Sequence, residues 1–133
     1  MQVILAAKEN NLRLGLQVLL TEEPNVDVVG TASTISGLLA LLKANQVDLV
    51  ILDDDMSSKQ TSDLIAQIKN CKSKPNVILL YSHDISPQFV SEMGIEAYVN
   101  KNEPPDRLIA AFRRIAAKKF SKLEDQEKEN SSS

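Results

Sequence analysis

Short runs of apolar residues alternate along this chain with longer stretches in which apolar residues recur at helical spacing. The clearest run covers residues 49–52, where consecutive apolar residues lead directly into Asp53, Asp54 and Asp55. A run rich in Val, Ile and Leu predicts a strand buried on both faces, as in a parallel sheet. In such a sheet, functional sites lie just beyond the carboxyl ends of the strands. The pattern therefore predicts that Asp53 lies at this edge of the sheet, where a functional site is expected. The same pattern also fits an acidic loop that only solubilises the strand end.

The whole chain follows this alternation and predicts five strands and five helices. Besides the run at 49–52, the expected strands are residues 3–7, 26–29 with Gly30 at the end, 77–81 and 97–99. The first expected helix is capped at Asn10 or Asn11, and the second is capped at Thr34 or Ser36. The third covers residues 61–71, and the fourth runs from Ser86-Pro87 to Gly94. The fifth begins at Pro104-Pro105. Residues 56–60 have the composition of a polar loop.

Strands that alternate with helices over short connections predict an α/β fold in which a parallel sheet is covered on both faces. Right-handed crossovers leave few topologies, and we expect the flavodoxin-like three-layer sandwich with strand order 2-1-3-4-5. That order brings the residues after four of the strands to one edge of the sheet. They are Ala7 or Lys8, Asp53, Tyr81 or Ser82, and Lys101.

Composition adds limits on size and partners. A chain of 133 residues with an apolar fraction of 43% suits one domain with a proper core. We expect the domain to cover residues 1–120, because residues 121–133 are almost entirely polar and predict a disordered tail. The net charge of -3 gives no general attraction to nucleic acid or to an anionic membrane. A lone cysteine, Cys71, and the lack of a secretory or membrane-spanning run indicate the cytoplasm.

The predicted edge and its surroundings carry a family resemblance. The chain resembles response-regulator receiver domains of two-component signalling, which have the CheY-like fold, and its pattern is most similar to receivers of the NarL/LuxR type. The resemblance covers about residues 2–118. The matching segments are Arg13-Leu14-Gly15-Leu16, residues 23–30, residues 48–53 with Met56, residues 94–101, and Pro104-Pro105.

The resemblance implies four chemical elements at the predicted edge. An aspartate after the third strand accepts a phosphoryl group from a histidine kinase, and Asp53 matches it. A lysine after the fifth strand pairs with that group, and Lys101 matches it. An acidic pair after the first strand holds Mg²⁺, which neutralises charge on the transferring group. A Thr or Ser after the fourth strand donates a hydrogen bond to a phosphoryl oxygen.

Two of these four elements depart from the family pattern. The acidic pair falls on Ala7 and Lys8, and a shift by one residue to Lys8 and Glu9 still loses one carboxylate. Because Ala7 offers no oxygen ligand and Lys8 offers a cation, we expect neither the Mg²⁺ site of the family nor another cofactor. The hydroxyl position falls on Tyr81, with Ser82 next to it as a substitute.

These departures raise hypotheses about Lys8 and the two tyrosines. Lys8 is either a built-in counter-ion for Asp53 or a solvent-facing side chain that leaves Asp53 as a relic. An ammonium ~4 Å from a carboxylate interacts by roughly 4 kcal/mol at an effective dielectric of about 20. Tyr98 matches the aromatic that family receivers rotate between buried and exposed states, and the bulk of Tyr81 would hold that switch in one state. Both tyrosines also fit half-buried core aromatics.

Other signals indicate little chemistry. His83 lies beside Asp84, but no motif places a nucleophile with it, which favours a surface loop. Asp53, Asp54 and Asp55 could form a metal cluster, but successive residues point in different directions and seldom converge on one ion, so only Asp53 is a strong candidate. The basic residues of the last helix fit a solvated face near the helix C-terminus, with a phosphate-binding groove as the alternative.

The resemblance therefore implies a response-regulator receiver in phosphorelay signal transduction whose Mg²⁺-dependent phosphorylation is impaired or absent. It would bind a partner protein, or itself, through its fourth helix, fifth strand and last helix, and would not be an enzyme. The alternative is a working phospho-acceptor that a histidine kinase phosphorylates at Asp53, with Glu9, Asp54 and Ser82 rebuilding the site. An enzyme of another flavodoxin-like class is disfavoured, because no phosphate-cradling loop is found. The chain is either a single receiver or part of a longer regulator.

Overall fold

A five-stranded parallel sheet forms the centre of the protein in the computed structural model, which describes residues 1–56, 61–82 and 87–131. The strand order is β2-β1-β3-β4-β5, so the predicted fold class and strand order are confirmed. The strands are β1 (Gln2–Ala6), β2 (Asp27–Ala32), β3 (Leu49–Asp53), β4 (Asn76–Tyr81) and β5 (Ala97–Asn100).

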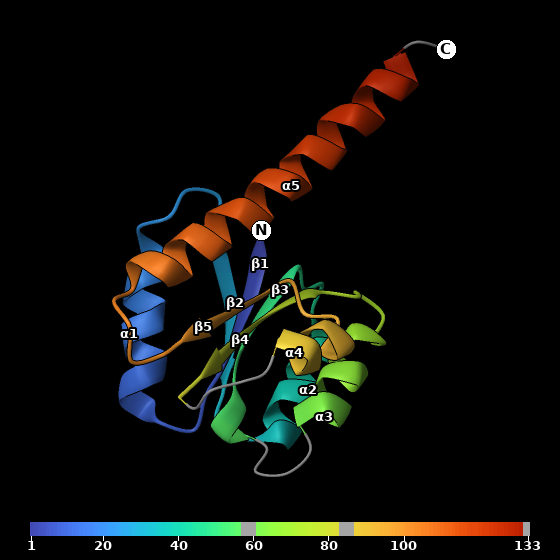
Figure 1. Ribbon diagram of the computed structural model, residues 1–133. Coiled ribbons are helices and arrows are strands. Elements are labelled where there is room, and N and C mark those ends of the chain that lie inside the picture. The colour runs from blue at the N-terminus through green and yellow to red at the C-terminus, as the bar shows by residue number, and fades with distance from the viewer. Residues whose placement is uncertain (57–60, 83–86, 132–133) are drawn as a thin grey trace.

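Helices cover both faces of the sheet, as Figure 1 shows: α1 and α5 lie on one face, and α2, α3 and α4 lie on the other. The helices are α1 (Asn10–Thr21), α2 (Ile35–Ala44), α3 (Thr61–Lys69), α4 (Pro87–Met93) and α5 (Asp106–Ser131), and a short 3-10 helix, η1 (Asp54–Met56), follows β3. Among the helices that the described residues form, none combines the length and the apolar character of a transmembrane span.

The central strand β3 is buried along its whole length, which explains its unbroken apolar sequence. Val50 and Leu52 belong to the core under α2, α3 and α4, whereas Leu49 and Ile51 belong to the core under α1 and α5. Full burial of one such side chain stabilises the fold by about 1.5–3 kcal/mol. Two cores on opposite faces therefore fix the register of β3, and with it the position of Asp53.

Several element ends differ from the predictions. Thr34 caps α2 by accepting a hydrogen bond from the Gly37 backbone N–H, but α1 is preceded by Glu9, so neither asparagine caps it. Strand β2 continues past Gly30 to Ala32, with a register shift where Ile4 pairs with Gly30. A Cβ at Gly30 would lie 2.6 Å from a methyl group of Leu41, so this strand position favours glycine.

Two segments expected to be irregular are helical. Met56 was expected in a polar loop, but it is a buried residue of η1 in the core under α3. The last helix, α5, continues to Ser131, although composition predicted a disordered tail after residue 120. Lys, Glu and Gln, which dominate this segment, are strong helix formers, so a polar sequence extends a helix that has already nucleated. The domain boundary at residue 120 stays a prediction.

Candidate functional site

The carboxyl ends of β3 and β5 bring Asp53 and Lys101 together. Asp53 is the last residue of β3 and keeps only 1% of its surface exposed. Lys101 directly follows β5, and its backbone N–H donates to the Tyr81 carbonyl at 2.8 Å, which fixes the start of the loop. From there its ammonium donates to Asp53 Oδ1 at 3.0 Å. The structure thus places both predicted residues in one buried ion pair.

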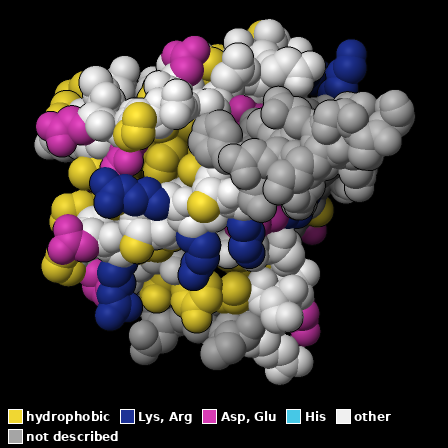
Figure 2. All heavy atoms as spheres, turned by 90° about the horizontal axis from the view of Figure 1, so that it is seen from above, with side chains coloured by type: hydrophobic (Ala, Val, Ile, Leu, Met, Phe, Trp, Pro, Cys, Tyr) yellow, Lys and Arg dark blue, Asp and Glu magenta, His cyan; other side chains and the backbone are white. Residues whose placement is uncertain are grey.

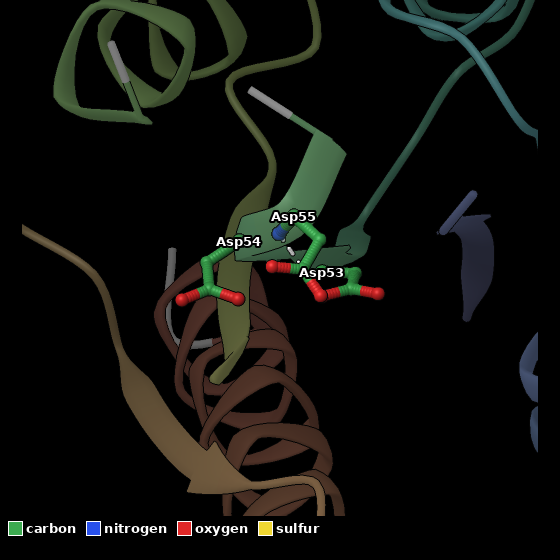
Figure 3. Close-up of side chains that lie close together, drawn as sticks. All are labelled: Asp53, Asp54 and Asp55. Carbon is green, nitrogen blue, oxygen red and sulfur yellow. Dashed lines mark hydrogen bonds between the residues drawn. The ribbon is translucent and has the colours of Figure 1, made fainter. Parts of the chain in front are cut away.

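Asp55 is a second acceptor for the same ammonium, a contact that the sequence pattern did not predict. Lys101 Nζ lies 2.5 Å from Asp55 Oδ2, and the Asp55 backbone N–H donates to Asp53 Oδ1 at 3.1 Å. The tight turn of η1 folds Asp55 back over Asp53, as Figure 3 shows. The expectation that consecutive aspartates would diverge is therefore wrong, because it assumed that the chain stays extended after β3.

Asp54 completes a cluster of three carboxylates. One oxygen from each of Asp53, Asp54 and Asp55 lies within 4.8 Å of the other two. Burial raises the pKa of Asp54, and the charges of Asp55 and Asp53 raise it further. Within the described part of the chain, the buried Asp54 Oδ1 has no hydrogen-bond partner. Asp54 therefore holds a proton more tightly than a free aspartate does.

Lys101 supplies the positive charge that this cluster requires. Burial alone would lower the pKa of its ammonium, but the hydrogen bonds to Asp55 and Asp53 outweigh burial and raise it. The side chain is only 14% exposed. The ammonium therefore stays charged throughout the neutral range.

In the loop after β1, the two positions that match the acidic pair of the family hold no carboxylate, and Lys8 does not form the predicted ion pair with Asp53. Ala7 is fully buried, whereas Lys8 is exposed and forms no ion pair with the residues that the structure describes. The hypothesis that Lys8 neutralises Asp53 is therefore not supported, because Lys101 reaches the carboxylate from the other side. Instead Arg13 Nη1 donates to the carbonyls of Ala7 (2.6 Å) and Lys8 (2.9 Å), while its Nη2 donates to Asn10 Oδ1. Arg13 thus positions the loop after β1, a role that the sequence pattern did not indicate.

The two tyrosines are neighbours across β4 and β5. Their ring centroids lie 5.6 Å apart with the planes tilted by 42°. Tyr81 is half-buried, but Tyr98 is 41% exposed, so the view of both as half-buried core aromatics fails for Tyr98. Ser82 directly follows β4 and is half-buried at the same edge. Its role as a substitute hydroxyl stays a prediction. His83 and Asp84 lie outside the described residues.

The basic residues of α5 whose side chains the structure describes, Arg107, Arg113, Arg114 and Lys118, are exposed to solvent, as expected. Arg113 donates to Glu23 with 2.9 Å between Nη2 and Oε1, and Arg107 pairs with Glu103 at 2.8 Å. The hydrogen bonds to Glu23, and then the charge of Glu23, raise the pKa of Arg113. Both guanidinium groups stay largely exposed, so these pairs contribute little to folding.

This fold and this edge of the sheet define a class of protein. Residues 3–113 match the family model for the response regulator receiver domain, and the chain therefore belongs to that family. The chain is 25% identical over 115 residues to the response regulator UvrY of Escherichia coli O6:H1, covering 85% of this chain and 53% of UvrY. It is 26% identical over 113 residues to the transcriptional regulatory protein DesR of Bacillus subtilis, covering 84% of this chain and 57% of DesR. The chain thus spans about half the length of these relatives.

Solved structures confirm the receiver fold. The response regulatory domain of MrkE from Klebsiella pneumoniae superposes with a TM-score of 0.78 at 21% identity, covering 88% of this chain and 96% of that one. A chain of the crystal structure of the P1 domain of CheA3 in complex with CheY6 from R. sphaeroides gives a TM-score of 0.72 at 22% identity, covering 87% of this chain and 96% of that one. Because both identities are below 25%, these likenesses establish the fold alone.

The residues at the first strand do not fit the Mg²⁺ that the family resemblance implies. Mg²⁺ requires oxygen ligands in near-octahedral geometry. Ala7 presents a buried methyl group, and Lys8 presents an exposed cation. Asp53 and Asp55 do offer oxygens, but both accept hydrogen bonds from the Lys101 ammonium. A metal ion here would have to compete with a cation that the protein itself supplies.

Proposed function

We propose that this receiver acts through protein–protein contacts and that Mg²⁺-dependent phosphorylation of Asp53 is impaired or absent. One observation carries the proposal: the Lys101 ammonium bridges Asp53 and Asp55, while the positions of the acidic pair hold Ala7 and Lys8. The carboxylate that would accept the phosphoryl group is therefore already neutralised, and the side chains that would hold the metal are absent.

The binding surface in this proposal is the face of α4, β5 and α5. Tyr98 on β5 is one of the large apolar side chains that remain exposed, and it lines a groove that extends to α5. Exposed aromatic side chains are enriched among residues that anchor protein–protein interfaces. Partner recognition by this face requires no chemistry at Asp53. Nothing in this function requires contact with nucleic acid or with a membrane.

The proposal is tested by phosphorylation with a small phospho-donor. We expect that acetyl phosphate with Mg²⁺ leaves the mass of the intact protein unchanged. The matched variant Ala7→Asp/Lys8→Asp restores the two carboxylates of the family, and it should gain a Mg²⁺-dependent phosphoryl group that Asp53→Asn abolishes. Phosphorylation of the unaltered protein at Asp53, to the same extent as in the restored variant, would overturn the proposal.

The second candidate is a working phospho-acceptor recognised by a histidine kinase. It is favoured by one observation, the burial of Asp53 at the end of β3 with Lys101 in hydrogen-bond distance, which is the pair that the family's chemistry uses. In this case Glu9, Asp54 or Ser82 would have to supply the missing ligands. A Glu9→Ala or Asp54→Asn variant would then lose phosphorylation, whereas Asp63→Asn, on the exposed face of α3, would keep it.

A further inference from the structure

A pocket of about 330 Å³ lies between α1 and the start of α5. Figure 1 shows both helices on the same face of the sheet. The floor of the pocket contains Leu80 and Val99, near the carboxyl ends of β4 and β5, and these residues are only 2% and 7% exposed. Its walls are mainly apolar residues of α1 and of the segment that leads into α5, among them Leu12, Leu16, Leu19, Pro104, Pro105 and Leu108. The pocket therefore opens onto the core that α1 and α5 cover.

The charged residues that line this pocket are already paired. They are Lys101 and Glu103. The Lys101 ammonium donates to Asp53 and Asp55, and Glu103 pairs with Arg107 at 2.8 Å. By contrast, the outer surface seen in Figure 2 carries Lys, Arg, Asp and Glu side chains next to hydrophobic atoms. Because burial of a charge without a counter-charge is costly, the pocket suits an uncharged occupant.

Gly15 forms part of the pocket wall in the middle of α1. Glycine destabilises a helix interior relative to alanine, so a glycine at such a position requires a reason. A Cβ on Gly15 would meet no neighbouring element within 4 Å, so internal packing does not exclude a side chain here. A side chain at position 15 would instead fill part of the pocket. The glycine thus keeps the pocket open.

We propose that this pocket binds a small, uncharged molecule that is mainly apolar and carries a hydroxyl or carbonyl group. Pockets for such molecules measure about 300–1,000 Å³ and combine apolar walls with a few polar groups. The side chains of Asn11 and Asn100 supply neutral polar groups in the lining. An amide donates to a carbonyl and accepts from a hydroxyl, so it orients such a ligand without a charge.

A small molecule fits this pocket better than a segment of a partner protein does. A specific protein–protein interface buries at least about 1,000 Å², whereas one molecule of ligand size fills a pocket of this volume. A partner helix would instead cover Leu14 and Val18, which are exposed on α1 but do not line the pocket. Protein docking on α1 is therefore the alternative that the experiment must separate.

The pocket is joined to the carboxylate cluster through Lys101. This residue lines the pocket, and its backbone N–H donates to the Tyr81 carbonyl at 2.8 Å. Its ammonium meanwhile donates to Asp53 and Asp55. A bound ligand would shift the loop after β5 and, with it, the ammonium. The inference rests on the proposed function in one respect, because it supplies an input signal for a receiver that phosphorylation does not switch.

Fluorescence titration of the full chain with prodan, an uncharged naphthalene dye with a carbonyl group, tests the inference. The titration needs neither Mg²⁺ nor a phospho-donor. We expect saturable binding, with NMR shifts at the backbone amides of Leu16, Lys101 and Leu108. Gly15→Ala should weaken prodan binding, and Gly15→Leu should weaken it at least about tenfold, because the larger side chain takes up more of the pocket.

The matched control is Gln17→Leu, because position 17 is exposed on α1 and does not line the pocket. This variant should keep the wild-type affinity for prodan. Both Gly15 variants should unfold in urea at the wild-type midpoint or above it, since alanine and leucine favour a helix more than glycine does. Weaker binding then reports a loss of the pocket rather than a loss of the fold.

The inference is overturned if prodan does not bind saturably, or if Gly15→Leu leaves its binding unchanged. It is also overturned if the NMR shifts centre on Leu39 and Cys71, which line a separate pocket between α2 and α3. Without prodan binding, the exposed apolar residues of α1 would point to a protein partner. Mass spectrometry after acetyl phosphate treatment tests the proposed function separately. A chain that is phosphorylated and still binds prodan would refute the proposed function alone, and one that does neither would refute only this inference.

Discussion

The ammonium of Lys101 lies 3.0 Å from Oδ1 of Asp53, and the carboxylate is almost completely buried. The two residues are separated by 48 positions in the sequence, yet the parallel order of β3, β4 and β5 brings them to one edge of the sheet. Asp55 shares the same ammonium, and Asp54 adds a third carboxylate beside them. Among the residues that the structure describes, Lys101 is the one cation that pairs with these carboxylates.

Replacing Lys101 with Met should destabilise the protein by about 2 kcal/mol at pH 7. Loss of one partner of a buried ion pair costs about 3–5 kcal/mol, and the partial exposure of Lys101 and Asp55 reduces that cost. Without the cation, the carboxylates of the folded state hold protons more tightly, so protonation at low pH stabilises the folded variant. The difference in the free energy of unfolding between the wild type and Lys101→Met should therefore shrink as the pH falls toward 4. Urea unfolding at pH 7 and pH 4 measures this.

Two companion variants make the Lys101→Met measurement specific. Adding Asp53→Asn in the Lys101→Met background removes the uncompensated charge and should recover part of the loss. Lys69→Met breaks the more exposed pair between Lys69 and Glu96, and should cost less than about 1 kcal/mol. Equal losses for Lys101→Met and Lys69→Met would contradict the account of a buried, shared ammonium.

Replacing Asp54 with Asn should stabilise the protein at neutral pH, by up to about 1 kcal/mol after allowance for solvent screening. The pKa of Asp54 is raised in the folded state from its ordinary value of 3.8 by burial and then by the neighbouring aspartates. Between 3.8 and that raised pKa, the folded state binds more protons than the unfolded state, so wild-type stability falls as the pH rises. The advantage of Asp54→Asn should therefore vanish below about pH 4.

The comparison for this prediction is Asp63→Asn, which removes one exposed carboxylate from α3 and so makes the same change in net charge away from the cluster. Chemical unfolding of the three proteins across pH 3.5–7.5 separates the effect of the buried carboxylate from that of net charge. If Asp54→Asn were less stable than the wild type at pH 7, the Asp54 carboxylate would stabilise the folded protein, and the prediction would be wrong.

Replacing Tyr81 with Thr should let the ring of Tyr98 move inward. The two rings now lie 5.6 Å apart, and Tyr98 is 41% exposed beside the bulk of Tyr81. The chain has two tyrosines and no tryptophan, so Tyr98 is the only strong fluorophore left in Tyr81→Thr. We expect acrylamide to quench the fluorescence of Tyr98 more slowly in Tyr81→Thr than in Tyr81→Phe. The Tyr81→Phe variant is the control, because it keeps an aromatic ring at position 81. Identical quenching in both variants would show that Tyr81 does not hold Tyr98 outward.

The sequence by itself determined the fold, the order of the strands and two members of the edge. Five apolar runs separated by helical periodicity leave room for few arrangements other than a doubly covered parallel sheet, because buried strands need cover on both faces. In that arrangement the residues that end β3 and follow β5 must meet, so Asp53 and Lys101 were predictable from their positions alone. The family resemblance pointed to the same two residues.

Only the tertiary structure decided how the edge is neutralised. The sequence left Lys8 as a candidate counter-ion, because the direction of a long side chain after a strand end is not set by periodicity. It also could not place Asp55 beside Lys101, since that contact depends on the tight turn of η1, nor show that Arg13 secures the loop after β1. Such contacts depend on loop conformation and side-chain rotamers, which local sequence patterns do not encode, whereas the alternation of buried and exposed positions is encoded directly.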